Sequence, residues 1–174
     1  GCDATLKRMN RKYDSARYYE SVRLLNEAYE TPGITTDLIV GFPGETEEEF
    51  QQTLAFIRRC AFSAMHIFPY SRRPGTPADG MPGQILNSVK EDRAHRAQQA
   101  ALEMEAAYLD RWVGRTVPVL FEEERDGLWR GHTTRYSEVA APSGENLHNQ
   151  LRQVYITGRA GNTLQGELCE GQEK

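Results

Sequence analysis

A glycine-rich turn between an apolar stretch and a helix start constrains the fold of this chain most strongly. Residues 34–40 are short, β-branched and mostly apolar, which is typical of a buried parallel strand. Gly and Pro dominate residues 41–44, and Thr46 with Glu49 has the spacing of a capping box that begins a helix. Ligands of parallel α/β sheets bind beyond the carboxyl ends of the strands, so this turn is a candidate ligand site. A plain connection between strand and helix would have the same pattern.

The elements around this turn predict a parallel α/β arrangement. A helix with an apolar stripe is expected over residues 15–30, and a second strand with alternating apolar residues over residues 62–70. A long helix then runs to about residue 112. Because two strands cannot close a barrel, we expect an unpaired edge and an uncovered apolar face.

The pattern changes near residue 113, where short strands separated by turn residues replace the helices. Five strands are expected, over residues 116–122, 128–134, 137–141, 151–157 and 163–169. Five short strands favour a small OB-like barrel. The sequence therefore divides into residues 1–112 and 113–174.

Composition excludes some classes of protein. The 174 residues are 26% charged and 39% hydrophobic, values that are ordinary for a soluble globular protein. No apolar run is long enough to span a membrane. The formal net charge of −4 argues against a globally basic nucleic-acid binder. A local run of Lys and Arg near residues 7–17 is compatible with phosphate contact or with a solvated face.

The three cysteines do not form a recognisable site. Cys2, Cys60 and Cys169 are far apart in sequence, and no Cys-x-x-Cys is present. This spacing matches neither a disulfide framework nor a metal-binding motif, so no metal ligand is assigned. Reduced thiols in a cytoplasmic protein are the expectation.

Two polar features flank the second predicted strand. His66 lies among apolar residues of that strand, and a histidine in this position is more often structural than catalytic. Arg72 and Arg73 come just after the strand, where guanidinium groups could meet phosphate or carboxylate. No catalytic residue is assigned.

Several blocks of sequence resemble the radical-SAM methylthiotransferases. Residues 39–46 read Ile-Val-Gly-Phe-Pro-Gly-Glu-Thr, and matching blocks occur at residues 1–13 and 66–78 and in the terminal β module. The resemblance covers nearly the whole chain. The block with His66, Phe68 and Tyr70 looks most like the branch that methylthiolates N6-threonylcarbamoyladenosine in tRNA.

The resemblance implies a fold and a missing part. Residues 1–112 would be the carboxyl-terminal part of a partial (βα)6 TIM-like barrel, and residues 113–174 a TRAM domain, an RNA-binding module. The chain does not begin with Met and lacks the family's Cys-x-x-x-Cys-x-x-Cys triad. We therefore expect a fragment that ligates no cluster, with two [4Fe–4S] clusters held by the amino-terminal part of the full-length protein. Alone, the fragment is not expected to be active.

The resemblance also implies site residues. S-adenosylmethionine would lie against Thr36, Val40, Gly41, Phe42 and Pro43 by backbone and packing contacts. Cofactor carboxylate or tRNA phosphate would meet Arg8 and Arg11, while Arg72 and Arg73 would hold tRNA. In the terminal barrel, the contacts to the anticodon stem-loop would come from Arg130, Arg135 and Tyr136.

The implied reaction inserts sulfur and then a methyl group at C2 of a modified adenosine next to the anticodon. Sister branches act on N6-isopentenyladenosine in tRNA or on a ribosomal protein, and they remain alternatives. An alternative of another class is a non-catalytic RNA-binding fragment. Residues 113–174 hold seven Lys and Arg against nine Asp and Glu, so any RNA affinity must come from a local patch.

Overall fold

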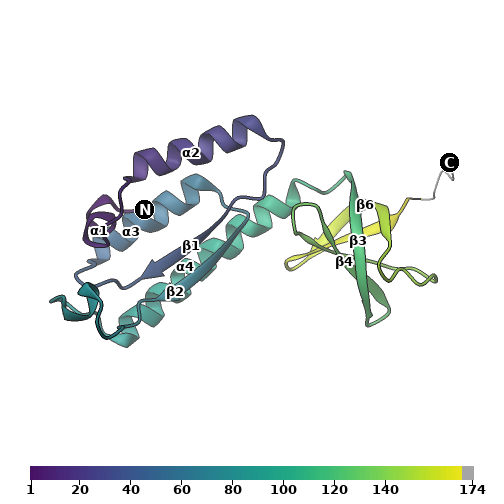
Figure 1. Ribbon diagram of the computed structural model, residues 1–174. Coiled ribbons are helices and arrows are strands. Elements are labelled where there is room, and N and C mark those ends of the chain that lie inside the picture. The colour runs from purple at the N-terminus through teal and green to yellow at the C-terminus, as the bar shows by residue number, and fades with distance from the viewer. Residues whose placement is uncertain (170–174) are drawn as a thin grey trace. The chain divides into compact units, whose positions relative to one another are not determined.

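The strand, glycine-rich turn and helix predicted from residue 34 onward are present in the computed structural model, which describes residues 1–169. β1 (Thr35–Val40) pairs in parallel with β2 (Ala64–Pro69), and the two form a two-stranded sheet (Figure 1). The turn after β1 leads into α3 (Glu47–Cys60). The Thr46 side chain accepts the Glu49 N–H, and the Glu49 carboxylate accepts the Thr46 N–H, which confirms the capping box.

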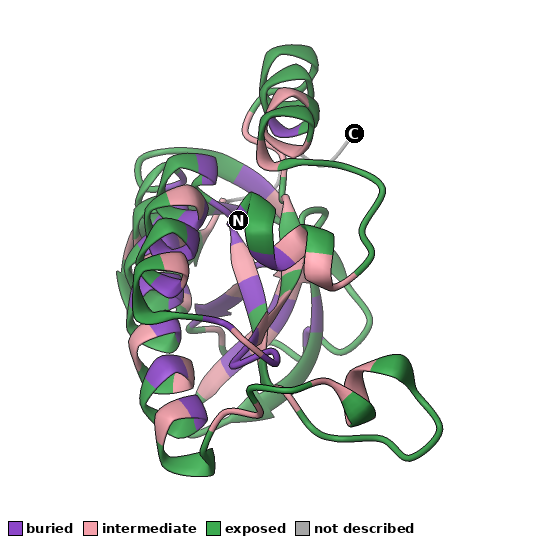
Figure 2. Ribbon diagram, turned by 90° about the vertical axis from the view of Figure 1, so that its left-hand side faces the viewer, coloured by how far each residue is buried: buried purple, intermediate pink, exposed green. Residues whose placement is uncertain are grey.

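Three further helices and one short 3-10 helix complete the first part of the chain. They are α1 (Asp3–Arg8), α2 (Ser15–Ala28), η1 (Pro77–Gly80) and α4 (Asn87–Asp110). Asp14 caps α2 by accepting the Arg17 N–H at 2.7 Å. Residues 71–76, between β2 and η1, are all exposed (Figure 2).

The two faces of the small sheet differ in what they pack against. Val40 and Met65 join a buried cluster with α3 and α4, and Leu38 and Ile67 pack against the same cluster. The alternate positions of both strands point the other way, and there His66 and Phe68 are exposed. Neither strand has a second partner among residues 1–169, as expected for an incomplete sheet.

The terminal strands form a closed barrel in the order β3-β4-β5-β7-β6. Their bounds are β3 (Thr116–Arg125), β4 (Leu128–Thr133), β5 (Glu138–Ala141), β6 (Leu151–Ala160) and β7 (Thr163–Leu168). All pairs are antiparallel except β5 with β7. The five strands lie within three residues of the predicted ranges.

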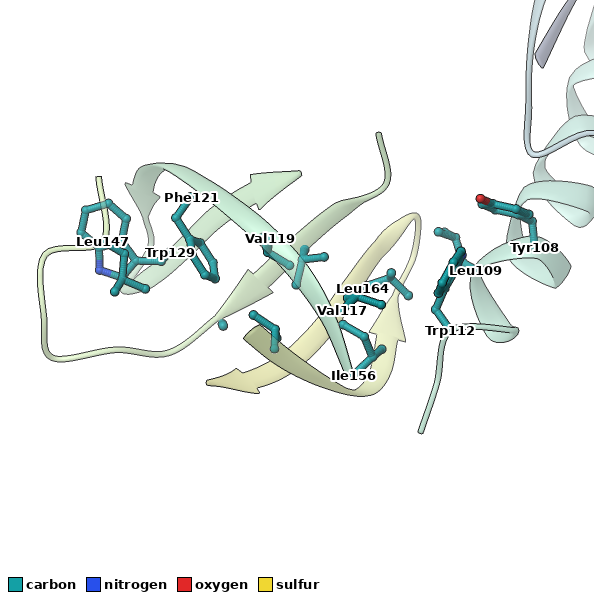
Figure 3. Packing of buried hydrophobic residues seen from close by; sticks show 13 residues of the cluster. Tyr108, Leu109, Trp112, Val117, Val119, Phe121, Trp129, Leu147, Ile156 and Leu164 are labelled. Atoms are coloured by element: carbon teal, nitrogen blue, oxygen red, sulfur yellow. The ribbon is translucent and has the colours of Figure 1, made fainter. Parts of the chain in front are cut away.

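The barrel encloses an apolar core. Val117, Val119 and Phe121 follow one another along β3 toward the interior, with Leu109 and Trp112 at one end of the row (Figure 3). Val119 and Phe121 are fully buried. The chain divides into two compact units between residues 104 and 105, inside α4, so we describe the α/β unit and the barrel separately.

The structure also bears on membrane association. No helix among residues 1–169 has both the length and the apolar character that crossing a membrane would require.

Candidate functional site

The turn after β1 is held tightly by its own unit. Gly41 and Gly44 both have left-handed backbone conformations, with φ of 69° and 74°. A Cβ atom on Gly41 would lie 2.5 Å from Cγ of Lys90, and the Gly44 N–H donates to the Gly83 carbonyl at 2.8 Å. Packing and backbone geometry therefore both favour glycine at position 41, and backbone geometry favours it at position 44.

A buried ion pair fixes the same turn. Glu45 turns back so that its Oε1 accepts the Gly41 N–H at 3.1 Å and the Arg93 guanidinium at 2.9 Å. Both charged side chains are about 5% exposed. Burial raises the pKa of Glu45, while the Gly41 N–H and Arg93 oppose that rise. The motif carboxylate thus ties β1 to α4, a role that sequence analysis did not assign.

A cavity of about 650 Å³ opens beside β1 in the α/β unit. Its walls come from α1, the start of α2, β1, α3, β2 and the segment after β2, with Leu6, Ile39, Phe56 and Phe68 among the apolar lining residues. α1 and the segment leading to η1 lie toward the carboxyl end of the sheet (Figure 1). The volume is in the range of small-molecule sites, and the mixture of apolar and polar walls is typical of them.

The predicted cofactor contacts divide into two groups. Thr36 lines the cavity, and its hydroxyl hydrogen bonds to the Tyr18 hydroxyl at 2.8 Å. The other four, Val40, Gly41, Phe42 and Pro43, are buried in the turn and are not among the lining residues. Contact between the cofactor and these five residues stays a prediction.

The four arginines predicted to contact ligands in the α/β unit also fall into two groups, those in ion pairs and those outside them. Arg8 forms a two-pronged ion pair with Glu49 of the capping box, and Arg72 pairs with Asp79 at 2.8 Å. Arg11 and Arg73 line the cavity and are exposed. Neither takes part in the ion pairs found within residues 1–169, so these two guanidinium groups are open to a ligand.

The predicted RNA contacts of the barrel lie on or near β4. Arg130 pairs with Glu138 at 3.2 Å, and the Arg135 guanidinium lies 5.3 Å from the centre of the Trp112 ring. Tyr136 is 86% exposed, and its ring stacks on His132 with centres 4.9 Å apart. Tyr136 is therefore a solvent-exposed aromatic ring in this region.

The strand register reveals a pair that sequence analysis missed. Asp37 of β1 is the direct neighbour of His66 of β2, and both are exposed on the face opposite the helices. That His66 is structural rather than catalytic stays a prediction. The side chain is exposed, and its ring centre lies 6.5 Å from that of Phe68. Only the parallel register, which the two strand sequences do not specify, could have paired these residues.

The described residues do not form a metal centre. No three His, Cys, Asp or Glu side chains of residues 1–169 are grouped so that they could hold a metal ion. Cys2 and Cys60 are buried, and burial raises the pKa of Cys60 to about 11, which makes its thiol a poor nucleophile or ligand. An iron–sulfur cluster therefore does not fit the residues present.

Comparison with protein families defines the class of this chain. Residues 1–57 match the family model described as the Radical SAM superfamily. The chain is 35% identical to the threonylcarbamoyladenosine tRNA methylthiotransferase MtaB of Bacillus subtilis over 90% of its length. It is 36% identical to a tRNA-2-methylthio-N(6)-dimethylallyladenosine synthase of Maricaulis maris and 40% identical to one of Sorangium cellulosum, over 97% and 98% of its length.

These matches agree with the motifs at residues 1–13, 39–46 and 66–78. The chain belongs to the radical-SAM methylthiotransferase family. It spans only 36–37% of the length of the three relatives named above.

Proposed function

We propose that this chain is part of a tRNA methylthiotransferase that adds a 2-methylthio group to N6-threonylcarbamoyladenosine next to the anticodon. The observation that carries the proposal is the cavity beside β1, on a chain whose relatives are named as tRNA methylthiotransferases. The block at residues 66–78 supports the threonylcarbamoyl branch. Relatives of the dimethylallyl branch are equally similar, so that branch is the first alternative, followed by modification of a ribosomal protein.

In this proposal the α/β unit supplies the last two strands of a partial (βα)6 TIM-like barrel. The unpaired edges of β1 and β2 and the open face of their sheet are what such a partial structure would have. The remaining strands, and two [4Fe–4S] clusters, would come from an amino-terminal part of the same protein. Because no group of side chains within residues 1–169 fits a cluster, we derive no step through one.

The cavity wall suits S-adenosylmethionine, which would supply both the radical and the methyl group when bound. The cavity is large enough to hold a nucleoside. The Thr36 hydroxyl can contact a hydroxyl group of the cofactor, and the unpaired Arg11 guanidinium can contact its carboxylate. The turn residues Val40–Pro43 would shape this wall by holding β1 against α4 rather than by touching the cofactor from an exposed position.

The closed barrel would be a TRAM domain that binds the tRNA anticodon stem-loop. Its strand order, with β5 parallel to β7, has the Greek-key pattern of OB-like barrels. Arg130 and Arg135 would contact phosphates, while Tyr136 would stack on a base. Arg72 and Arg73 of the α/β unit would add contacts to the same tRNA. Since the substrate is tRNA, we place the protein in the cytoplasm.

Nucleoside mass spectrometry of tRNA from a strain lacking the gene tests the substrate. We expect the 2-methylthio group to disappear from N6-threonylcarbamoyladenosine alone, and complementation with the full-length gene to restore it. Loss from the isopentenyl nucleoside alone would refute the proposed branch. Unchanged tRNA nucleosides would refute both tRNA branches.

A non-catalytic RNA-binding protein is the second candidate, and the absence of a metal-ligating group among residues 1–169 favours it. The iron and sulfide content of the intact gene product after anaerobic reconstitution separates the two. About eight irons per chain are expected for two [4Fe–4S] clusters. An iron-free product that still binds tRNA would support the second candidate.

A further inference from the structure

A second cavity of the α/β unit lies between the chain that follows β2 and the first turns of α4. Its volume is about 450 Å³, and it is lined by residues 69–72 and by Asn87, Lys90 and Glu91 of α4. Residues 69–71 also line the larger cavity, so the two cavities adjoin. Two of the lining side chains are cations and one is a carboxylate, which gives the wall an excess of positive charge.

Lys90 is a buried lysine without a carboxylate partner. Only 7% of the residue is exposed, and the ion pairs of the neighbouring turns of α4 within residues 1–169 use Arg93 and Arg96 instead. The Lys90 ammonium has one hydrogen bond among those of residues 1–169, to Oδ1 of Asn87 at 3.4 Å, and it lies 5.5 Å from the centre of the Tyr70 ring. Because an ammonium has three donors and buried charges are normally paired, this group is suited to an anionic ligand.

Packing fixes the position of this ammonium group. The aliphatic stem of Lys90 covers the turn after β1 so closely that a Cβ atom on Gly41 would lie 2.5 Å from Cγ of Lys90. The stem therefore has little freedom, and the charge stays at the cavity wall when no ligand is bound. An anion that binds there does not have to order the side chain, which lowers the entropic cost of binding.

Other groups of the wall also suit an oxyanion. The Tyr70 hydroxyl is buried and has no hydrogen-bond partner among residues 1–169. The wall includes the amino-terminal end of a 24-residue helix, where the first N–H groups have no intrahelical acceptor and the helix dipole favours negative charge. Arg72 donates two hydrogen bonds to Asp79 and keeps further N–H donors. Glu91 is exposed and would oppose an anion.

We propose that this cavity binds a phosphate group through Lys90, and that the ligand is a backbone phosphate of the tRNA. The assignment to tRNA rests on the proposed function, whereas the anion site itself does not. A phosphate offers enough acceptor oxygens for the Lys90 ammonium, the Tyr70 hydroxyl and helix N–H groups together. Because the cavity adjoins the larger one, the phosphate belongs to a nucleotide close to the modified adenosine.

The salt dependence of RNA binding tests the proposal. Full-length, reconstituted protein is titrated at several salt concentrations with two anticodon stem-loops, which carry threonylcarbamoyladenosine or unmodified adenosine at the same position. Lys90→Met removes the ammonium and keeps an unbranched stem, while Tyr70→Phe removes the hydroxyl. Arg58→Met is the matched control, because it removes a positive charge near the end of α3, close to the start of β2 and away from this cavity.

We expect Lys90→Met to weaken the binding of both stem-loops by roughly tenfold at low salt, because a charge-assisted hydrogen bond is lost. The slope of log Kd against log salt concentration should fall by about 0.7–0.9, the value for one phosphate contact. Tyr70→Phe should weaken binding by roughly threefold with an unchanged slope, because the hydroxyl is neutral. Glu91→Gln should tighten binding, and Arg58→Met should keep the wild-type affinity and slope.

Thermal stability separates a binding role from a structural one. An ammonium that is buried without an anion costs free energy in the ligand-free fold. Lys90→Met should therefore have a Tm at or above that of the wild type. Inorganic phosphate should raise the Tm of the wild type by more than that of Lys90→Met, and this difference cancels the general effect of the salt on stability.

Three results would overturn the inference while leaving the proposed function intact. One is an unchanged salt slope together with an unchanged phosphate response in Lys90→Met. Another is a Lys90→Met loss confined to the threonylcarbamoyl stem-loop, which would assign the site to the carboxylate of that substituent. The third is a lower Tm with unchanged RNA binding, which would mean that a carboxylate elsewhere in the full-length protein pairs with Lys90.

Failure of the proposed function has a different signature. A wild-type protein that binds neither stem-loop would refute tRNA as the ligand. A phosphate-induced rise in Tm that is reduced in Lys90→Met would still support the anion site in that case.

Discussion

The barrel and the α/β unit differ in whether the edges of their strands are paired. Each barrel strand pairs on both sides, so the closed sheet has no free edge. In the α/β unit, β1 and β2 pair only with each other, and each leaves an edge without a partner among residues 1–169. Free edges and open sheet faces invite further pairing, so the barrel is closed to additional strands, whereas the sheet of the α/β unit can still accept them.

The two units also differ in the chemistry of their interiors. The buried charged residues of the described chain are Glu45, Lys90 and Arg93, and all three belong to the α/β unit. In the barrel, the buried polar residue is Ser137. The barrel therefore depends on apolar packing, whereas the α/β unit also depends on a charged pair that holds the turn after β1. The unit with the candidate site is the one that buries charge.

Separating the units should have the largest effect. A fragment of residues 105–174 should unfold cooperatively on heating, because its core and its strand pairs are internal. A fragment of residues 1–104 should aggregate or lack a cooperative transition, because its sheet stays open. Both tryptophans, Trp112 and Trp129, lie in the barrel, so their fluorescence reports on it alone and circular dichroism can follow the other fragment. A cooperative transition in residues 1–104 would contradict the comparison.

A single added methyl group should test how closely the barrel strands are packed. A Cβ atom on Gly131 would lie 2.1 Å from the Leu120 carbonyl oxygen, a backbone atom that cannot rotate away. We expect Gly131→Ala to lower the free energy of unfolding of the barrel by about 4 kcal/mol or more. Gly158→Ala is the matched control, since nothing lies within 4 Å of its Cβ position. Equal effects of the two variants in denaturant titrations followed by tryptophan fluorescence would disprove this explanation.

Local patterns were enough to predict much of the fold. The capping box of Thr46 and Glu49 joins residues three apart, and it placed the start of α3 correctly. Buried and exposed residues alternate along β3 and β6, and both strands end at Gly-containing turns, so their positions were also predictable. In both cases the signal lies within about ten residues of the element it specifies.

The site residues were harder to predict, because their partners are distant in sequence. Glu45 and Arg93 are 48 residues apart, and Arg8 lies 41 residues from Glu49. Sequence analysis treated Arg8 and Arg72 as open to ligands, and only the tertiary structure revealed their carboxylate partners. The Asp37–His66 pair follows from strand register, which is set by packing of whole strands rather than by either residue.

Removing half of the buried ion pair should destabilise the α/β unit without affecting the barrel. Arg93→Met leaves the Glu45 carboxylate buried with the Gly41 N–H as its remaining partner, so we expect a loss of about 3 kcal/mol. Glu45→Gln retains an acceptor for both donors and should cost less. Circular dichroism should report the change, while tryptophan fluorescence of the barrel stays at its wild-type midpoint. A loss shared equally by both probes would show that the units unfold together.

The smallest expected effect concerns stability at acidic pH, and it should appear in the α/β unit but not in the barrel. Arg96 holds Glu47 through two contacts of 2.7 and 2.9 Å and lowers the pKa of Glu47 to about 2, from 4.5 for an unperturbed glutamate. The folded-state pKa is the lower one, so this contribution is present above pH 4.5 and is lost as the pH falls toward 2. Glu47 is 46% exposed, and solvent screening therefore limits the contribution to about 0.5–1 kcal/mol.

Glu47→Gln should accordingly reduce the stability of the α/β unit at pH 6 and have a vanishing effect near pH 2. Glu124→Gln in the barrel is the control, because Glu124 is exposed and takes part in none of the ion pairs within residues 1–169. Denaturant titrations at both pH values, followed by circular dichroism, measure the difference. A Glu47→Gln effect that persists unchanged at pH 2 would mean that packing of the side chain against Arg96, rather than its charge, stabilises this corner of α3.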